Sequence, residues 1–163
     1  VTIRPATEAD VPLITEIYND AILNTTATFD TEIKTVDDRL QWFRNHDSKH
    51  PVLVATYNDS IVGWASLTLW SDRCAYEGTS EVSVYVHKDH RAKGIGKKRL
   101  EILVLEGEKC GLHYFLARIT HGNQDSIHLH ELVGFSHAGV MHEVGFKFGK
   151  YLDVTLMEIS NAY

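Results

Sequence analysis

The feature that most constrains this chain is a strand, a basic glycine-containing turn and a helical pattern that follow one another without a break. The strand contains Val84, Tyr85 and Val86. The turn after it carries Gly94 and Gly96. Beyond the turn, apolar residues recur at a spacing of three and four, which predicts a helix with one buried face: Leu100, Leu103 and Val104. The glycines therefore lie at the N-terminus of a helix.

A helix N-terminus in this position is suited to bind an anion. Its first backbone N–H groups lack partners within the helix, and the helix dipole adds partial positive charge. Glycine removes the side chain where the backbone must come close to a ligand. Basic side chains in the same segment add full charges: Arg91, Lys93, Lys97 and Lys98. The segment predicts a binding site for a phosphate or a pyrophosphate.

Composition excludes several other classes of protein. A length of 163 residues with 44% hydrophobic content fits a single domain over residues 1–163. The chain has 16 basic and 22 acidic residues, a net charge of −6, which argues against a nucleic-acid or anionic-membrane partner. The basic excess at residues 91–99 is therefore a local feature. Two cysteines without a Cys-x-x-Cys pair, and no secretory or membrane-spanning segment, indicate a reduced, cytoplasmic setting.

The order of the predicted elements indicates the fold class. Helices are expected to begin after Thr7, Thr35 and Asn123, and one is expected to stop at Gly134. The order of strands and helices predicts an α/β (α+β) fold with one mixed, mostly antiparallel sheet and flanking helices. Strands are expected at residues 2–4, 52–57, 61–69, 80–86, 114–120, 135–141 and 151–159, with loops at 24–29, 70–79 and 143–150.

The glycine turn and its surroundings resemble a known family. Arg91-x-x-Gly94-x-Gly96 directly after the strand resembles the coenzyme A loop of the GCN5-related N-acetyltransferase (GNAT) superfamily. A dinucleotide fingerprint would need a third glycine where Arg99 stands. Further segments resemble the phosphinothricin or methionine sulfoximine acetyltransferase branch over nearly the whole chain: the runs 80–86 and 145–149, Asn123, Ser126, and the pair His130 and Glu131.

For the donor, the resemblance implies acetyl-CoA as cosubstrate. In this superfamily the strand before the glycine loop and the next strand splay apart, and the pantetheine arm enters the notch between them. Backbone groups of Val84 and Val86 would then pair with the pantetheine amides. The resemblance assigns coenzyme binding to Val84, Tyr85, Val86, Arg91, Ala92, Lys93, Gly94, Ile95, Gly96, Lys97, Asn123 and Ser126.

Two residues are expected to carry the chemistry. An amine that arrives protonated must lose a proton before it attacks a thioester, so a nearby carboxylate is useful. Glu81 lies on the strand roughly 10 Å before the part expected to contact the coenzyme, and the resemblance aligns it with the catalytic glutamate of the branch. His130 is aligned with the general acid for the leaving thiolate, and its pKa near neutrality suits that role. The alternatives are a solvated carboxylate and a packing or surface histidine.

The acceptor pocket is assigned by the resemblance. Arg73 is suited to hold a carboxylate or phosphinate through its planar fork, and Lys147 would add a second positive group, across a dimer interface. The alternatives are that both are ordinary surface cations and that Phe29 is a core residue. The residues assigned to acceptor binding are Phe29, Arg73, Cys74, Ala75, Tyr76, Glu81 and Lys147.

The 10 histidines do not predict a metal site. His128 and His130 lie two apart on a predicted helix, so at roughly 100° per residue their side chains diverge. His87 and His90 lie beside the glycine turn without the carboxylate pattern of a metal site. No metal is expected.

Together these features predict an N-acetyltransferase that transfers an acetyl group from acetyl-CoA to the α-amine of a small amino-acid analogue. Methionine sulfoximine, methionine sulfone and phosphinothricin are the leading acceptors. The glycine-containing loop has no cysteine, so a covalent acetyl-cysteine intermediate is not expected. One alternative is a polyamine or a protein N-terminus as acceptor. Another is a coenzyme A sensing module without turnover. The resemblance also implies a homodimer.

Overall fold

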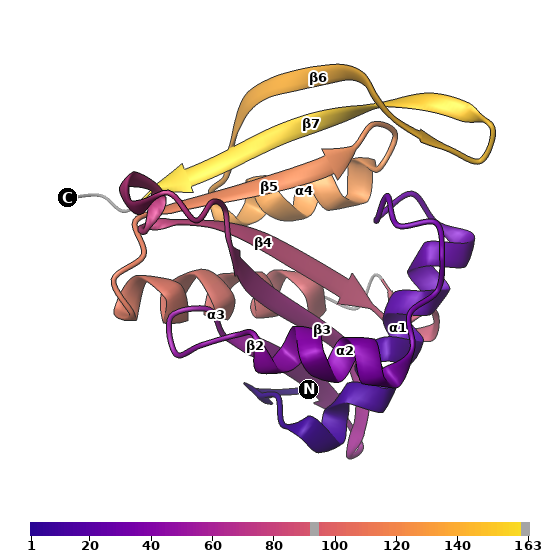
Figure 1. The fold of residues 1–163 in the computed structure, drawn as a ribbon, viewed down its shortest axis with the longest axis vertical. Coiled ribbons are helices and arrows are strands. Elements are labelled where there is room, and N and C mark those ends of the chain that lie inside the picture. The colour runs from indigo at the N-terminus through magenta and orange to yellow at the C-terminus, as the bar shows by residue number, and fades with distance from the viewer. Residues whose placement is uncertain (92–94, 161–163) are drawn as a thin grey trace.

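A computed structural model describes residues 1–91 and 95–160. The described residues form one seven-stranded sheet in the order β1-β2-β3-β4-β5-β7-β6 (Figure 1). All neighbouring strands are antiparallel except β4 and β5, which are parallel. This confirms the predicted mixed, mostly antiparallel sheet. The strands are β1 Thr2–Pro5, β2 Val52–Tyr57, β3 Ser60–Leu69, β4 Thr79–Val86, β5 Tyr114–Thr120, β6 Ser136–Lys147 and β7 Lys150–Ser160.

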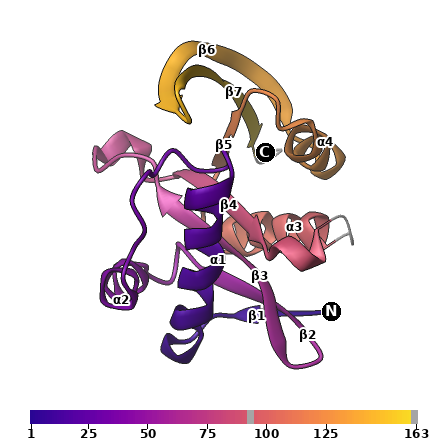
Figure 2. The ribbon, with the colours of Figure 1, turned by 90° about the vertical axis from the view of Figure 1, so that its right-hand side faces the viewer.

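Helices cover both faces of the sheet (Figure 2). Helices α1 Val11–Asn24 and α2 Val36–Arg44 lie on one face, and α3 Ile95–Lys109 and α4 Gln124–Val133 lie on the other. Two of the expected caps are present: the side chain of Thr35 accepts from the backbone of α2, and that of Asn123 accepts from the backbone of α4. After Thr7 a short 3-10 helix, Glu8–Asp10, comes first, and α1 begins only at Val11. Gly134 ends α4 at a φ of 112°, a conformation that favours glycine. Among the described helices, none combines the length and apolar character needed to cross a membrane.

The parallel pair β4 and β5 opens soon after it begins. The two strands are paired only at Thr79, Ser80 and Glu81 of β4, and the last pair joins Glu81 to Leu116. They then diverge, although β4 stays paired with β3 as far as Val86 (Figure 1). Within the described chain, the edge of β4 that faces β5 therefore has no strand partner after Glu81. This is the expected splay of the central strands.

Two apolar clusters hold the helices to the sheet. On the α3 side, Leu100 and Leu103 pack with Leu67 and Phe115. Gly107 allows this close approach, because a Cβ there would lie 2.7 Å from the ring of Phe115. On the α1 side, the cluster consists of Ile14, Ile17, Tyr18, Ile22, Val52, Val54 and Trp64.

Arg99 lies in the core although the sequence pattern counted it with the basic segment. The side chain is 0% exposed, and within the described chain none of its three guanidinium nitrogens has a hydrogen-bond partner. The guanidinium occupies the space that a side chain at Gly63 would need, because a Cβ at Gly63 would lie 2.0 Å from Nη1. Burial lowers the pKa of Arg99. Its charge is therefore not presented to a ligand at the surface.

The prediction of a loop at residues 143–150 is wrong. β6 continues to Lys147, and β7 begins at Lys150 after a two-residue turn at Phe148 and Gly149. Both turn residues have positive φ, 52° and 78°, as a tight hairpin requires. Register shifts between His137 and Gly139 and between Met141 and Gly145 interrupt the alternation along β6, which is why its pattern did not predict a single strand.

Candidate active site

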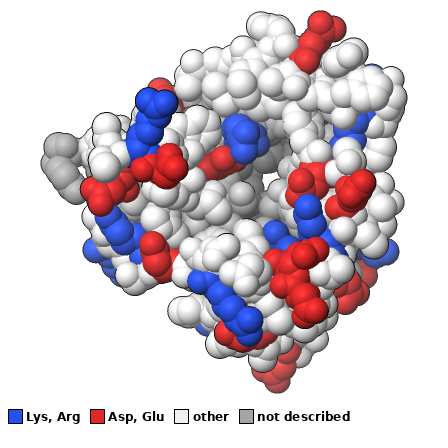
Figure 3. Space-filling view, in the orientation of Figure 1, with Lys and Arg blue, Asp and Glu red and all other residues white. Residues whose placement is uncertain are grey.

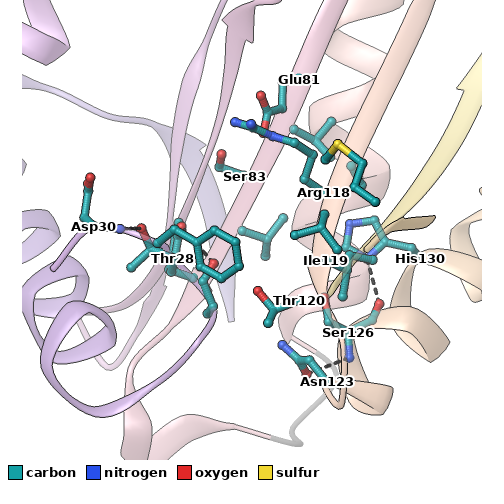
Figure 4. Close-up of a pocket in the computed structure, with 18 of the residues that line it drawn as sticks. Thr28, Asp30, Glu81, Ser83, Arg118, Ile119, Thr120, Asn123, Ser126 and His130 are labelled. Atoms are coloured by element: carbon teal, nitrogen blue, oxygen red, sulfur yellow. Dashed lines mark hydrogen bonds and ion pairs between the residues drawn. The ribbon is translucent and has the colours of Figure 1, made fainter. Parts of the chain in front are cut away.

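The splay opens into a cavity of about 600 Å³. Most of its wall comes from β4, β5, α4 and the segment of residues 25–30 after α1, which we call the roof loop, and a few residues of α1, β6 and β7 complete it. Figure 3 shows the hollow on the face seen in Figure 1, with acidic and basic side chains at its rim. Of the residues predicted for the site, the cavity brings together Phe29, Glu81, Val84, Tyr85, Asn123, Ser126 and His130. Figure 4 labels Glu81, Asn123, Ser126 and His130 among the lining residues.

The cavity reaches both faces of the sheet. Side chains alternate between the faces along a strand, and Tyr85 packs with the α1 cluster whereas Val82 and Val84 pack with the α3 cluster. Glu81 and Ser83 therefore point to the α1 face. All five residues line the cavity. The gap between β4 and β5 thus connects an α1 side, where Glu81 lies, with a side formed by α3 and α4.

Glu81 faces an arginine that the sequence pattern did not single out. Arg118 lies two residues beyond Leu116, the register partner of Glu81, and so points to the same face. Its Nε donates to Oε2 of Glu81 over 2.8 Å. The pair lies at the mouth of the cavity, since the Arg118 side chain is 51% exposed and that of Glu81 is 17% exposed. The sequence contains a signal that could have identified this residue, because Arg118 is the one charged residue in the mostly apolar strand Tyr114–Thr120.

The roof loop is held through its backbone. The hydroxyl of Thr120 on β5 donates to the carbonyl oxygen of Thr26 over 2.6 Å. The hydroxyl of Tyr85 on β4 donates to the carbonyl oxygen of Ala27 over 3.4 Å. The two diverging strands therefore hold the same loop above the gap between them.

Lys147 holds the roof loop as well. Its side chain is 4% exposed, and Nζ donates to the carbonyl oxygen of Thr28 in the same chain over 2.7 Å. Burial lowers the pKa of its ammonium group. Lys147 does not line the cavity of its own chain, because its ammonium group is bound within the fold. Its expected contact with an acceptor across a dimer interface stays a prediction.

Phe29 combines its two expected roles. Its ring lines the cavity and also packs directly on Gly145 of β6, where a Cβ would lie 2.1 Å from a ring carbon. The absence of a side chain at Gly145 therefore positions the ring. Phe29 is at once a wall of the cavity and an anchor of the roof loop.

A polar and aromatic cluster supports the roof loop from α1 and α2. The hydroxyl of Tyr18 donates to the carboxylate of Asp30 and lies 3.0 Å from Oγ1 of Thr28. Burial, together with the Asp30 contact, raises the pKa of Tyr18 to about 12. The guanidinium of Arg39 stacks 3.7 Å from the ring centroid of Trp42 and 4.4 Å from that of Tyr18. Tyr18, expected only as part of an apolar stripe, is thus a neutral phenol at the cavity wall.

His130 is buried, with 5% of its surface exposed. Its ring packs against Phe135 with a centroid distance of 5.1 Å, and Nδ1 lies 2.7 Å from the carbonyl oxygen of Ser126. A carbonyl oxygen only accepts, so Nδ1 carries the hydrogen of the neutral ring and Nε2 carries a lone pair. Burial lowers the pKa of His130, which favours this neutral form. The arrangement suits a hydrogen-bond acceptor rather than the expected general acid.

The start of α4 forms the wall opposite the roof loop. Asn123 and Ser126 line the cavity, and the side chain of Asn123 accepts from the backbone N–H of Ser126 over 3.3 Å. Gly96, at the start of α3, lies against α4: a Cβ there would be 3.1 Å from Cδ2 of Leu129. The absence of a side chain at Gly96 therefore permits close packing of α3 on α4. Its predicted contact with the coenzyme stays a prediction.

The basic side chains of the glycine segment are partly engaged. Arg91 lies 3.6 Å from Asp20 of α1, and Lys97 lies 3.7 Å from Glu101. These two cations, together with Val86, Ile95 and Gly96, do not line the cavity. Three further residues of the predicted coenzyme site lie outside the described residues: Ala92, Lys93 and Gly94.

The predicted acceptor segment does not line the cavity, although Trp70 at its start lies near Arg118 at the cavity mouth. The pairing of β3 with β4 ends at Leu69 and Ser80, so residues 70–79 extend beyond the ladder. Within this connection a short exposed turn spans Cys74–Tyr76. Four residues predicted to bind the acceptor are absent from the cavity wall, and their role stays a prediction: Arg73, Cys74, Ala75 and Tyr76.

No three His, Cys, Asp or Glu side chains in the described ranges 1–91 and 95–160 are grouped as a metal site requires. His128 is exposed and His130 is buried, in keeping with their predicted divergence on α4.

A mixed sheet whose parallel strands splay over a cavity that contains a carboxylate is the architecture of an acyl-CoA-dependent N-acetyltransferase. The chain belongs to the acetyltransferase (GNAT) domain family, whose model matches residues 3–156. It is 41% identical over 160 residues to the L-methionine sulfoximine/L-methionine sulfone acetyltransferase of Salmonella typhimurium, covering 98% of this chain and 94% of the relative.

Two further comparisons agree with this family. The chain is 36% identical over 162 residues to the phosphinothricin N-acetyltransferase of Streptomyces coelicolor, covering 97% of this chain and 95% of that protein. The YncA protein of Salmonella typhimurium, described as an acetyltransferase and solved with its cofactor acetyl-CoA, superposes with a TM-score of 0.96 at 40% identity, covering 99% of this chain and 95% of that one. The resemblance noted from the glycine segment is confirmed.

Proposed function

We propose that this enzyme transfers the acetyl group of acetyl-CoA to the α-amine of a small amino-acid analogue, with methionine sulfoximine, methionine sulfone and phosphinothricin as the leading acceptors. The names of the relatives support this acceptor class. The observation that carries the proposal is the position of Glu81, at the point where β4 and β5 separate and on the wall of the cavity. A carboxylate there meets an amine that arrives from the α1 side.

The reaction needs one proton acceptor. The ammonium group of the acceptor releases a proton to Glu81, directly or through water, and the free amine attacks the thioester carbonyl carbon. The new C–N bond forms, the C–S bond breaks, and coenzyme A leaves as a thiolate. The proton that the nitrogen then loses neutralises the thiolate. No acid is required for a thiol leaving group, and a neutral His130 serves to shape the wall and hold the start of α4.

The donor site is supported by the unpartnered edge of β4. Amides of the pantetheine arm would pair with backbone groups of Val84 and Val86 along this edge, as a strand would. Asn123 and Ser126 would contact the arm from α4, and the pyrophosphate would lie at the N-terminus of α3. The cavity open to both faces gives acetyl-CoA and the acceptor separate approaches to Glu81.

We further propose a cytoplasmic homodimer. Exposed apolar side chains on the hairpin of β6 and β7 supply a surface for a second copy: Val140, Val144, Phe146, Phe148 and Tyr151. β6 is also the edge strand of the sheet formed by the described residues. Sedimentation velocity of the wild type and of Phe146→Ser tests this, since loss of the apolar surface should shift a dimer to monomer.

The acceptor is tested by coenzyme A release with a panel of amino-acid analogues and polyamines. Methionine sulfone and methionine sulfoximine should be acetylated faster than spermidine or a peptide N-terminus, and faster acetylation of spermidine would refute the amino-acid assignment. Glu81→Gln should retain acetyl-CoA binding and lose most of the transfer rate, by a factor on the order of 10²–10⁴. Binding without transfer by the wild type would favour the sensing module instead.

A further inference from the structure

We propose that Arg118 binds the α-carboxylate of the acceptor, so that Arg118 and Glu81 together recognise the charged head group of an α-amino acid. This inference rests on the proposed function and assigns a binding residue for it. In the zwitterion of an α-amino acid one carbon separates the ammonium group from the carboxylate. Glu81 and Arg118 present the complementary pair of charges side by side at the cavity mouth, with Nε and Oε2 at 2.8 Å.

Both members of the pair keep groups available for a ligand. Arg118 uses Nε for Glu81, and within residues 1–91 and 95–160 its two terminal nitrogens donate to no other group. Glu81 uses Oε2, and its Oε1 accepts from no group in the same ranges. A guanidinium can bind a carboxylate through two parallel hydrogen bonds. The ammonium group can contact Oε1 while the carboxylate contacts the terminal nitrogens of Arg118.

The other cations near the cavity are engaged in the fold or lie outside the cavity wall. Lys147 donates to the carbonyl oxygen of Thr28 and lies outside the cavity wall. The guanidinium of Arg39 is buried against Trp42. Arg73 lies in the exposed connection between β3 and β4. Among the described residues that line the cavity, Arg118 is therefore the one arginine or lysine available to an acceptor carboxylate.

Trp70 contributes to the position of Arg118. The guanidinium carbon of Arg118 lies 6.0 Å from the centroid of the Trp70 ring, which is at the limit of a cation–π contact. Glu81 and Trp70 both contact the guanidinium of Arg118, so its conformational freedom is restricted although half of the side chain is exposed. A restricted fork loses less conformational entropy when it binds a carboxylate.

The arrangement predicts selectivity among amines. An acceptor with a carboxylate on the carbon that carries the amine satisfies both charges. A polyamine brings a second positive charge toward Arg118, and a peptide N-terminus has an amide where the carboxylate would be. Both alternative acceptors should therefore bind more weakly than a free α-amino acid.

The test measures equilibrium binding of methionine sulfone to the full-length protein saturated with coenzyme A, by calorimetry, alongside initial rates with acetyl-CoA. Arg118→Met should raise the Kd and the KM for methionine sulfone about 10- to 100-fold and leave the KM for acetyl-CoA unchanged. The methyl ester of methionine sulfone should bind the wild type weakly and should be insensitive to Arg118→Met. Arg44→Met is the matched control, because Arg44 also pairs with a glutamate at 2.8 Å and is 54% exposed, but lies outside the cavity.

The outcomes separate this inference from the proposed function. The role of Arg118 would be overturned by unchanged binding of methionine sulfone in Arg118→Met, or by equal binding of the acid and its methyl ester. It would also be overturned if binding were lost in Arg73→Met and retained in Arg118→Met. Acetylation of methionine sulfone with these results would leave the acetyltransferase assignment intact. Binding that depends on Arg118 and on the carboxylate, without acetylation of any amino acid, would uphold the inference and refute the proposed function.

Discussion

Replacement of Arg99 by methionine should stabilise the protein. The guanidinium is 0% exposed and its three nitrogens have no hydrogen-bond partner in the part of the chain that the structure describes. A buried charge without a partner costs several kcal/mol. Methionine keeps the apolar stem and leaves a small void, which costs about 1 kcal/mol. We therefore expect the free energy of unfolding to rise by about 2–4 kcal/mol and the Tm by about 5–12 °C.

Urea denaturation followed by tryptophan fluorescence, with a thermal scan by circular dichroism, measures this effect. Lys98→Met on the exposed side of the same helix is the control and should change the free energy of unfolding by less than about 0.5 kcal/mol. Gly63→Ala should destabilise the wild type and be less harmful beside Arg99→Met, because its Cβ would lie 2.0 Å from Nη1. An Arg99→Met protein no more stable than the wild type would show that the guanidinium is well solvated or paired, contrary to the structure.

Three further results are expected. Gly145→Ala should displace the ring of Phe29, because a ring carbon lies 2.1 Å from the position of the added Cβ. The KM for the acceptor should rise severalfold while the KM for acetyl-CoA is unchanged. Equal effects on the two KM values would contradict this. Gly96→Val should crowd Leu129 and lower the free energy of unfolding by about 1–3 kcal/mol, and an unchanged denaturation midpoint would refute this. Burial lowers the pKa of His130, so the unfolded chain binds its proton first and stability should fall as pH drops below about 6.5. His130→Asn should reduce the pH dependence of the free energy of unfolding measured from denaturation curves. An unchanged pH dependence in this variant would show that His130 is not its source.

The fold was predictable because local signals and the global arrangement agree. The cap residues Thr35 and Asn123 and the stop at Gly134 occur where the chain needs them, and the strand patterns place the central ladder correctly. The hairpin of β6 and β7 was missed because register shifts break the alternation on which a strand prediction depends. The splay could be expected only from the family resemblance, since no local pattern reports where two parallel strands part.

The candidate site was predictable where one strand carries it. Glu81 and the start of α4 lie in the cavity as expected. Arg118 was missed because its partner is 37 residues away in the sequence and meets it only through the register of β4 with β5. The contact of Lys147 with Thr28 was missed because it joins the end of a strand to a loop 119 residues away. Such contacts are set by the tertiary fold, by sheet register in one case and by the path of a loop in the other, and one sequence reports neither.

The way the roof loop is attached bears on how acceptor preference can evolve. The hydroxyl of Thr120, the hydroxyl of Tyr85 and the ammonium of Lys147 all donate to backbone carbonyl oxygens of the loop. Every amino acid offers such an oxygen, so substitutions at residues 26–28 leave these three anchors in place. The loop can therefore vary in side chains while it keeps its path. Mutations there can explore new acceptors without loss of the architecture around Glu81.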